Sequence, residues 1–261
     1  MSALQQLHTM TTIVADTGDL AAIARLKPTD ATTNPSLITK ALIEPDNQAM
    51  LADMMSRHQG DVDAVIDALT IQIGCDILAL IEGRVSTEVD ARLSYDTQAT
   101  IDKALEFMDA YAKAGIDSER VLIKMAATWQ GIEAARYLET QNIHCNLTLL
   151  FGQHQAIACA DAGVTLISPF VGRILDWQKR QQNRQNVPVT DDMGVQSVKL
   201  IYQYYKQHDY KTQVMGASFR SVEQIVALAG CDLLTIAPNL IDELAAMDTE
   251  VTLQLSPNIS M

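Results

Sequence analysis

Short strand-like runs of apolar and alternating residues are separated by longer helical stretches along the whole chain. The runs occupy residues 12–17, 31–34, 84–90, 121–126, 145–150, 165–170, 213–219 and 233–238. A helix signal follows each run, and longer helical inserts are expected at about 47–81 and 194–208. Eight strand–helix units in 261 residues predict a (β/α)8 barrel with extra helices, which we expect to form one domain over residues 1–261.

Local capping signals mark several helix boundaries. Pro35 stands at a first helical position after the second run, and Asp96 opens a helix that Gly115 ends. Ser221 and Gln224 have the spacing of a capping box. These signals predict helices after the second, third and seventh runs.

Two further features bear on the fold. Residues 178–194 form the most polar segment of the chain, which predicts a mobile loop. A doubly wound open sheet is the alternative architecture, but no GxGxxG follows the first run to mark a dinucleotide site. The barrel is therefore the favoured fold.

Nearly every predicted strand has one polar face. Side chains alternate across a strand, so each run divides into two faces. Lys124 shares a face with Leu122 and Ala126, in a run that is otherwise apolar. The other residues on polar faces are Asp16, Thr32, Asn34, Ser86, Glu88, Asp90, Asn146, Thr148, Ser168, Gly216, Ser218 and Arg220. Since helices should cover the outside of the sheet, we expect these faces to point into the barrel, near the carboxyl ends of the strands.

Composition and charge restrict the environment and the partners. Hydrophobic residues make up 48% of the chain, enough to bury a large core. No apolar stretch approaches the ~20 residues that span a membrane, and the first residues lack the pattern of a secretion signal, which predicts a cytoplasmic protein. The net charge of −13, without a block of Lys or Arg, argues against nucleic-acid or anionic-membrane binding.

The cysteines and histidines do not suggest a metal site. Cys75, Cys145, Cys159 and Cys231 stand far apart without a CxxC pair, which favours reduced, buried thiols over disulfides or metal ligands. The five histidines show no HExxH or other ligand spacing. We therefore expect no bound metal.

Lys124, Asp16 and Glu88 together indicate catalysis. A single Ser or Thr in a strand usually has a structural role. Burial of three ionisable groups destabilises the folded state, so it indicates that they have a function. A neutral amine attacks carbonyl carbons, and enclosure away from water favours the neutral form. Lys124 is thus a candidate for Schiff-base formation, with Glu88 and Asp16 as proton relays.

Two arginines are candidates for holding a phosphate. Arg173 and Arg220 stand at the carboxyl ends of the sixth and seventh runs, and Ser218 with the helix opened by Ser221 would add donors. A surface role explains either arginine alone equally well. Together with the lysine, the pair favours a sugar phosphate as substrate.

At these residues the sequence resembles the transaldolases of the pentose phosphate pathway, over almost its whole length. The motifs that carry the resemblance, in the family's order, are DATTNPSLI (30–38), GRVSTEVDARLSYDT (83–97), VLIKMAATWQGIEAA (121–135), NLTLLF (146–151), LISPFVGRILDW (166–177), IYQYYK (201–206) and MGASFR (215–220). The resemblance implies transfer of a dihydroxyacetone unit from sedoheptulose 7-phosphate to glyceraldehyde 3-phosphate, without a metal or organic cofactor. It also makes a homodimer an expectation.

The resemblance assigns roles to individual residues. It implies that Lys124 forms the Schiff base and that Asp16 is the acid/base at the bond being cleaved. Glu88 and Thr148 would hold the catalytic water. The residues implied in substrate binding are Asn34, Asn146 and Ser168 for the sugar, and Arg173, Ser218 and Arg220 for the phosphate.

The related fructose 6-phosphate aldolases are one alternative. They carry tyrosine at the position of Phe170 and glutamine at that of Glu88, so both residues of this chain favour the transferase. A phenyl ring cannot donate a proton or position water as a phenol can. Transfer of the dihydroxyacetone unit to an aldehyde acceptor should therefore be faster than its release by water.

A shortened paralogue that binds sugar phosphates without turnover is the second alternative. Family members of this branch usually continue as further helices packed on the barrel, whereas this sequence ends after the helix that follows the eighth run. Two other departures from the family's pattern are local: Ala127 stands where serine is common, and FGQHQA (151–156) is unusual where the family tends to have a small or aromatic residue pair. Every residue implied in the site is nevertheless retained.

Overall fold

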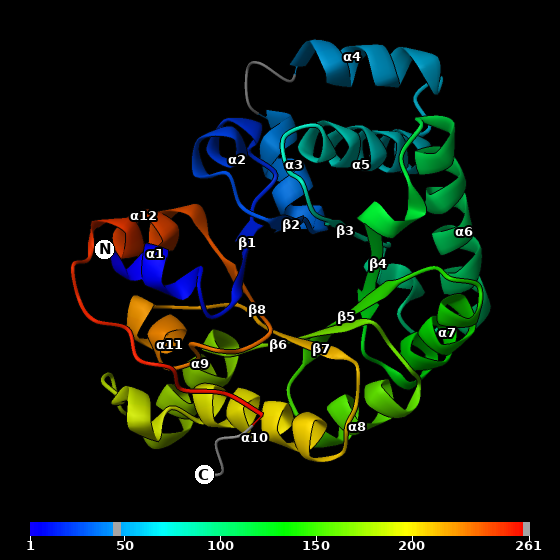
Figure 1. The fold of residues 1–261 in the computed structure, drawn as a ribbon. Helices are drawn as coiled ribbons and strands as arrows, with labels where there is room; N and C mark the ends of the chain where they lie inside the picture. The colour runs from blue at the N-terminus through cyan, green and yellow to red at the C-terminus, as the bar shows by residue number, and fades with distance from the viewer. Residues whose placement is uncertain (44–47, 258–261) are drawn as a thin grey trace.

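The computed structural model describes residues 1–43 and 48–257 and contains eight parallel strands closed into a barrel (Figure 1). Each strand pairs with its neighbours in sequence, and β1 pairs with β8 to close the ring. The strands are β1 Thr12–Asp16, β2 Asp30–Thr32, β3 Val85–Glu88, β4 Val121–Ala126, β5 Cys145–Leu150, β6 Leu166–Pro169, β7 Gln213–Gly216 and β8 Leu233–Ile236. The predicted (β/α)8 fold is confirmed, and all strands but β2, which begins one residue early, lie within their predicted runs.

Helices surround the barrel (Figure 1). They are α1 Ala3–Leu7, α2 Leu20–Leu26, α3 Pro35–Ile43, α4 Gln48–Arg57, α5 Val62–Leu78, α6 Thr97–Lys113, α7 Trp129–Thr140, α8 Gln153–Asp161, α9 Gly172–Gln182, α10 Met193–Gln207, α11 Val222–Val226 and α12 Pro238–Ala246. Within the described ranges, three 3-10 turns lie between them, η2 Ala91–Leu93, η3 Ser118–Arg120 and η4 Val189–Asp191. None of the described helices is both long enough and apolar enough to cross a membrane.

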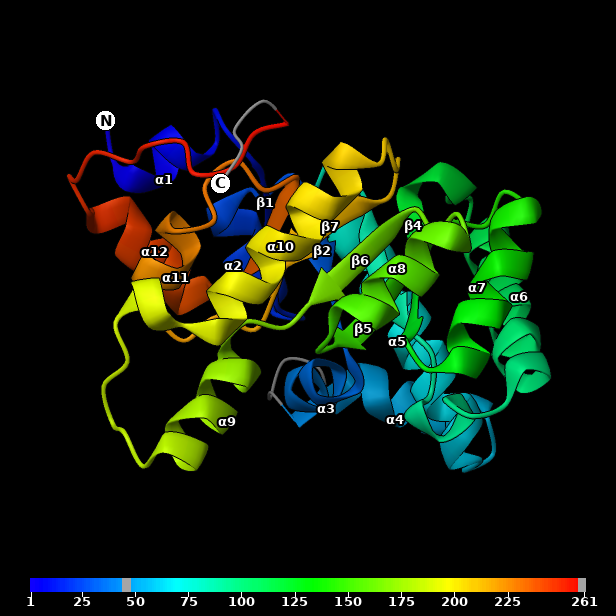
Figure 2. The same cartoon turned by 90° about the horizontal axis from the view of Figure 1, so that it is seen from below.

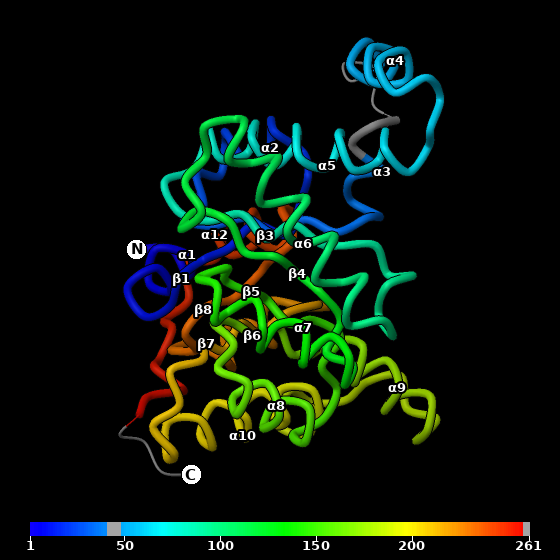
Figure 3. The backbone as a smooth tube through the Cα atoms, turned by 90° about the vertical axis from the view of Figure 1, so that its right-hand side faces the viewer, coloured from blue at the N-terminus to red at the C-terminus, as the bar shows by residue number. Residues whose placement is uncertain are grey.

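Both helical inserts are confirmed. The insert expected at 194–208 is α10, and the one expected at 47–81 consists of α4 and α5, although its first residue, Asn47, lies outside the described residues. Helix α4 lies beyond α5, away from the strands (Figures 1 and 3), and none of its residues is buried. The insert therefore adds to the helical layer without entering the barrel.

Helix starts follow the sequence signals in two places. Pro35 is the first residue of α3, and the side chain of the preceding Asn34 accepts a hydrogen bond from that helix. Asp96 caps α6 in the same way, and Gly115 follows the helix in the left-handed conformation (φ 79°) that glycine adopts freely.

The capping box predicted at Ser221 and Gln224 is wrong. The Ser221 side chain makes no cap hydrogen bond to α11. The Gln224 amide oxygen instead accepts from the Arg220 N–H at 2.7 Å, and its nitrogen donates to the buried Asp192 carboxylate at 2.6 Å. A buried carboxylate needs hydrogen-bond donors. Because Gln224 donates to Asp192, its side chain does not cap the helix.

The mobile loop predicted at 178–194 is wrong at both ends, because residues 178–182 belong to α9 and residues 193–194 begin α10. Gln178 is buried, donates to the Asp191 carbonyl at 2.8 Å and accepts from the Met193 N–H at 3.0 Å. Its amide thus ties the end of α9 to the start of α10. Figure 2 shows α9 projecting from the same side of the molecule as α3, opposite α1 and the last described residues.

The barrel interior consists of an apolar layer below a polar one. The apolar layer is a cluster of Val14, Leu122, Leu166, Met215 and Leu233. Two residues farther along four of these strands stand Asp16, Lys124, Ser168 and Thr235. Because side chains alternate, the second set also points inwards, one layer nearer the carboxyl ends. The outward residues, such as Ile123 and Leu147, are fully buried against the helices.

The inward face predicted for the seventh strand is wrong. Met215 belongs to the inner apolar layer, so Gly216 points outwards, where a Cβ would lie 3.0 Å from the Leu234 side chain. Strand β7 ends there, and the alternation rule no longer applies to the residues beyond it. Ser218 reaches the cavity because the chain turns at this residue, with a φ of 62°.

Asp90 also departs from its predicted inward position. It lies beyond the end of β3, where its side chain caps η2 and pairs with Arg92. The Arg92 guanidinium lowers the pKa of the Asp90 carboxyl. Asp90 is therefore a loop-ordering residue outside the polar layer.

Candidate active site

Lys124 lies inside the barrel, in contact with one carboxylate and one carbonyl. Only 7% of the residue is exposed. Its Nζ lies 3.0 Å from Glu88 Oε2 and donates to the Thr33 carbonyl at 3.0 Å. Lys124 and Glu88 are direct partners in the pairing of β3 with β4. The register of the sheet therefore places the amine and the carboxylate together.

Asp16 belongs to a second polar group on neighbouring strands. The Thr32 hydroxyl donates to Asp16 Oδ1 at 3.2 Å and lies 2.9 Å from the Thr235 hydroxyl. Thr235 is not among the residues predicted from the sequence. It is the polar residue of β8, and the alternation that places Ser168 inside the barrel applies to it equally.

Asn146 lies beneath the site. It is fully buried, its amide nitrogen donates to the Ser86 hydroxyl at 3.0 Å, and its amide oxygen accepts from the Ser168 hydroxyl at 2.6 Å. These bonds join β3, β5 and β6 across the barrel. Asn146 thus fixes the orientation of Ser168, which lines the cavity above it.

The predicted residues converge on a cavity of about 260 Å³ at the carboxyl ends of the strands. Those that line it are Asp16, Asn34, Lys124, Thr148, Ser168, Phe170, Arg173, Ser218 and Arg220. Glu88 contacts Lys124 but lines a neighbouring cavity between α3, α5 and α6. Among the residues predicted to have a catalytic or substrate-binding role, only Glu88 and Asn146 are absent from the lining of the described cavity.

The two arginines stand at one edge of this cavity. The Arg173 guanidinium lies over the Phe170 ring, 5.7 Å from its centroid. Arg220 Nη1 lies 3.3 Å from the Ser218 hydroxyl, whereas Nε and Nη2 donate to Asp176 at 3.2 and 2.7 Å. Asp176 thus holds one edge of the Arg220 guanidinium and leaves Nη1 beside Ser218, where an anion would find several donors.

Strand β5 bends directly after Thr148. Its register with β6 shifts between Leu147 and Leu150, and Leu149 has a φ of 60°. This left-handed conformation costs a leucine about 1–2 kcal/mol, so contacts around it must hold it in place. Thr148 lines the cavity, and no described residue forms a hydrogen bond with its hydroxyl. The hydroxyl is therefore available to a substrate or a water molecule.

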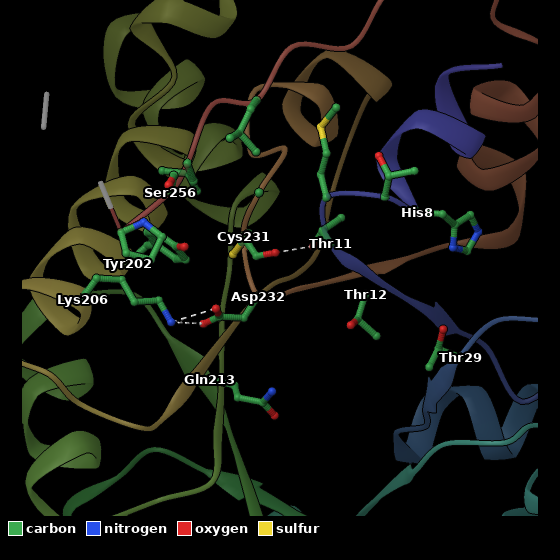
Figure 4. Close-up of a pocket in the computed structure, with 16 residues that line it drawn as sticks. His8, Thr11, Thr12, Thr29, Tyr202, Lys206, Gln213, Cys231, Asp232 and Ser256 are labelled. Atoms are coloured by element: carbon green, nitrogen blue, oxygen red, sulfur yellow. Dashed lines mark hydrogen bonds and ion pairs between the residues drawn. The ribbon is translucent and has the colours of Figure 1, made fainter. Parts of the chain in front are cut away.

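A larger cavity, of about 840 Å³, opens at the amino-terminal end of the barrel. Figure 4 shows Lys206 directed at Asp232 there, and its Nζ donates to both carboxylate oxygens at 2.8 and 2.9 Å. Burial, assisted by Asp232, raises the pKa of Cys231 to about 12, so this thiol is protonated at neutral pH. The described lining thus offers a paired amine and a protonated thiol, and the polar cavity at the other end is the better candidate for catalysis.

The remaining cysteines do not supply a reactive site. All four are free thiols, and Cys145, Cys159 and Cys231 are buried. Burial raises the pKa of Cys159 to about 12. Within residues 1–43 and 48–257, no group of three His, Cys, Asp or Glu side chains is arranged to hold a metal ion.

Comparison with known proteins gives a family match and several similar relatives. The family model described as Transaldolase/Fructose-6-phosphate aldolase matches residues 13–259. A transaldolase of Methylococcus capsulatus is 56% identical over 264 residues, which cover 97% of this chain and 80% of that protein. A transaldolase of Gloeobacter violaceus is 55% identical and covers 98% and 68%, and transaldolase B of Pasteurella multocida is 54% identical and covers 98% and 83%.

Both kinds of comparison extend over the barrel and its site. The family match begins in β1 and continues past β8, so it includes every strand that carries a cavity residue. The three relatives are each more than half identical over nearly the whole chain. The chain belongs to the transaldolase/fructose-6-phosphate aldolase family.

Proposed function

We propose that this protein is a transaldolase, which transfers a dihydroxyacetone unit from sedoheptulose 7-phosphate to glyceraldehyde 3-phosphate and yields erythrose 4-phosphate and fructose 6-phosphate. The observation that carries the proposal is the contact of Lys124 with Glu88 inside the barrel, beside a cavity that also contains Asp16. The relatives named transaldolase support the same reaction.

The first half of the reaction joins the donor to Lys124. The neutral amine attacks the ketone carbon, and the resulting carbinolamine loses its hydroxyl as water to give the Schiff base. Glu88 would accept and return the protons of this dehydration, and its distance of 3.0 Å from Nζ supports that role. The hydroxyl of Thr148 would hold the departing water with it.

The second half breaks and remakes a carbon–carbon bond. Asp16 takes the proton of the hydroxyl next to the scissile bond, the aldose phosphate leaves, and the bonding electrons form an enamine on Lys124. The enamine attacks the acceptor aldehyde, Asp16 returns the proton, and water adds to the new Schiff base to release the product ketose and free Lys124. The hydrogen bond from Thr32 to Asp16 Oδ1 fixes the carboxylate for this exchange.

Arg220 should contribute to binding of the substrate phosphate. Replacing Arg220 by alanine should raise the KM for fructose 6-phosphate by about 10–100-fold, because hydrogen bonds to charged groups are worth roughly 1.5–3 kcal/mol. The turnover number at saturation should change little, since the phosphate is remote from the bonds that react. Steady-state kinetics measures both constants.

Arg180→Ala is the matched control for that substitution. Arg180 is exposed on α9, so its replacement removes the same charge without touching the cavity lining. Its KM should stay near the wild-type value. Equal increases in the two variants would mean that net charge, and not a phosphate contact, determines the effect.

Phe170 should limit release of the donor fragment to water. The Phe170 ring lines the cavity and packs edge-on against Phe151, with centroids 5.5 Å apart. Replacing Phe170 by tyrosine should raise the formation of free dihydroxyacetone from fructose 6-phosphate, without acceptor, by about tenfold or more, because a phenol activates water. Phe151→Tyr, at a 46% exposed ring outside the cavity lining, is the control. Similar release in both variants would remove Phe170 as the determinant.

A two-substrate assay tests the proposed function against its alternatives. Fructose 6-phosphate and erythrose 4-phosphate together should give glyceraldehyde 3-phosphate and sedoheptulose 7-phosphate. Rapid formation of free dihydroxyacetone without an acceptor would favour the aldolase. Calorimetric binding of fructose 6-phosphate with no product would favour the inactive paralogue.

We further propose that the protein works in the cytoplasm, as a single barrel domain over residues 1–261. The four free thiols support a reducing compartment. A homodimer stays a prediction, which light scattering after size-exclusion chromatography tests.

A further inference from the structure

The side-chain amide of Gln155 connects three main-chain atoms near the carboxyl end of the barrel. Gln155 lies at the start of α8, and its Nε2 donates to the Ala127 carbonyl at 2.9 Å and to the Leu149 carbonyl at 3.1 Å. Its Oε1 accepts from the Phe151 N–H at 2.9 Å. Both amide hydrogens and the oxygen are engaged, so the amide has a single orientation that satisfies all three partners.

These main-chain atoms lie at or just beyond the carboxyl ends of β4 and β5, the strands that carry Lys124 and Thr148. Ala127 follows β4 directly, and Leu149 follows Thr148 in β5. The Ala127 N–H also donates to the Thr148 carbonyl at 2.8 Å. Gln155 therefore reinforces the junction between β4 and β5 at the level of the proposed site.

The bend at Leu149 requires such reinforcement. Leucine disfavours the left-handed conformation that this residue adopts, and the register with β6 shifts at the same point. Without the bonds from Gln155, this segment can relax towards extended backbone. Relaxation would reorient the peptide next to Thr148 and displace Phe151, whose ring packs against Phe170.

We propose that Gln155 is a positioning residue, whose amide holds the bent end of β5 so that the Thr148 hydroxyl faces the amine of Lys124 and the carboxylate of Glu88. Gln155 is not part of the cavity lining, so it acts through Thr148. The inference rests on the proposed function, because the placement of Thr148 matters for the water of the Schiff-base steps.

Two substitutions at Gln155 test the proposal. Gln155→Ala removes all three bonds, and Gln155→Glu keeps the shape while replacing the two donors by an acceptor that faces two carbonyls. Both should lower kcat by about 10–100-fold, because displacing a reacting group by ~1 Å has effects of this size. The KM for fructose 6-phosphate should change less than about threefold, since the phosphate contacts are untouched.

Gln153→Ala is the matched control. Gln153 is the same residue type at the start of the same helix, exposed and without a hydrogen bond from its side chain to the described residues. It should keep wild-type kcat. The concentration of active sites is determined by complete borohydride trapping, and kcat is calculated per active site. A substitution that only reduces the amount of folded protein leaves this kcat unchanged. An unchanged kcat in the Gln155 variants would overturn the proposal.

A substitution at Leu149 tests the role of the bend. Glycine adopts a φ of 60° freely, so Leu149→Gly added to Gln155→Ala should recover about threefold or more of the lost kcat. No recovery, or wild-type kcat in both Gln155 variants, would contradict the positioning role. Failure of the wild-type protein to form any adduct would instead contradict the proposed function, which separates the two.

Discussion

Replacing Lys124 by arginine should abolish transfer, lowering kcat by at least about 10⁴-fold. A guanidinium stays protonated under all ordinary conditions and cannot attack a carbonyl. Arginine nevertheless keeps a positive charge beside Glu88, so this largely buried carboxylate is not left without a counter-ion. Steady-state turnover with fructose 6-phosphate and erythrose 4-phosphate measures the loss, and thermal unfolding verifies that the variant folds.

Lys206→Arg provides the comparison. Lys206 is also partly buried and also pairs with a carboxylate, that of Asp232, but at the amino-terminal end of the barrel. The same substitution there should leave turnover close to that of the wild type. If Lys124→Arg retained more than about a tenth of wild-type kcat, Lys124 could not be the nucleophile.

Replacing Asp16 by asparagine should lower kcat by about 10³-fold and change which adduct accumulates. The amide cannot take the proton that must leave before the carbon–carbon bond breaks, but Lys124 and Glu88 can still form the Schiff base. Borohydride should therefore trap the intact six-carbon sugar phosphate on the variant, where it traps a three-carbon unit on the wild-type protein. Intact-protein mass spectrometry distinguishes the two.

The mass of the trapped adduct makes this prediction specific to Asp16. Asp191→Asn, the same chemical change at an exposed residue of η4, should behave as the wild type. A three-carbon adduct on the Asp16 variant at the normal rate would mean that another group removes the proton. Absence of any adduct would mean that Asp16 already acts in Schiff-base formation.

The sequence predicts most of the barrel because one physical pattern repeats in every strand. Outward residues such as Ile123 pack on helices. Inward side chains of the same strand change from apolar, at Leu122, to charged, at Lys124. Periodicity places both correctly. It fails at Met215, because the strand ends at Gly216 and the turn at Ser218 redirects the chain. It fails at Gln178 too, because a polar segment predicts a loop. The hydrogen bonds of the buried Gln178 side chain to Asp191 and Met193 cannot be inferred from the sequence.

The candidate site could be predicted in part, for the same reason. Alternation alone brings Glu88 and Lys124 into the barrel, and the register of adjacent strands then makes them partners. The pairing of Arg220, in the segment before α11, with Asp176, in α9, joins residues far apart in sequence, so no local pattern reveals it. The left-handed backbone at Leu149 is equally hidden, because leucine itself does not favour it. The individual catalytic roles come from the family resemblance and from chemistry.

The central claim is that Lys124 forms a Schiff base with a sugar phosphate. Incubation of the wild-type protein with fructose 6-phosphate and borohydride, followed by intact mass and peptide mapping, tests it most directly. We expect one three-carbon adduct, located on Lys124. No adduct, or an adduct on Lys206 or another lysine, would contradict the account.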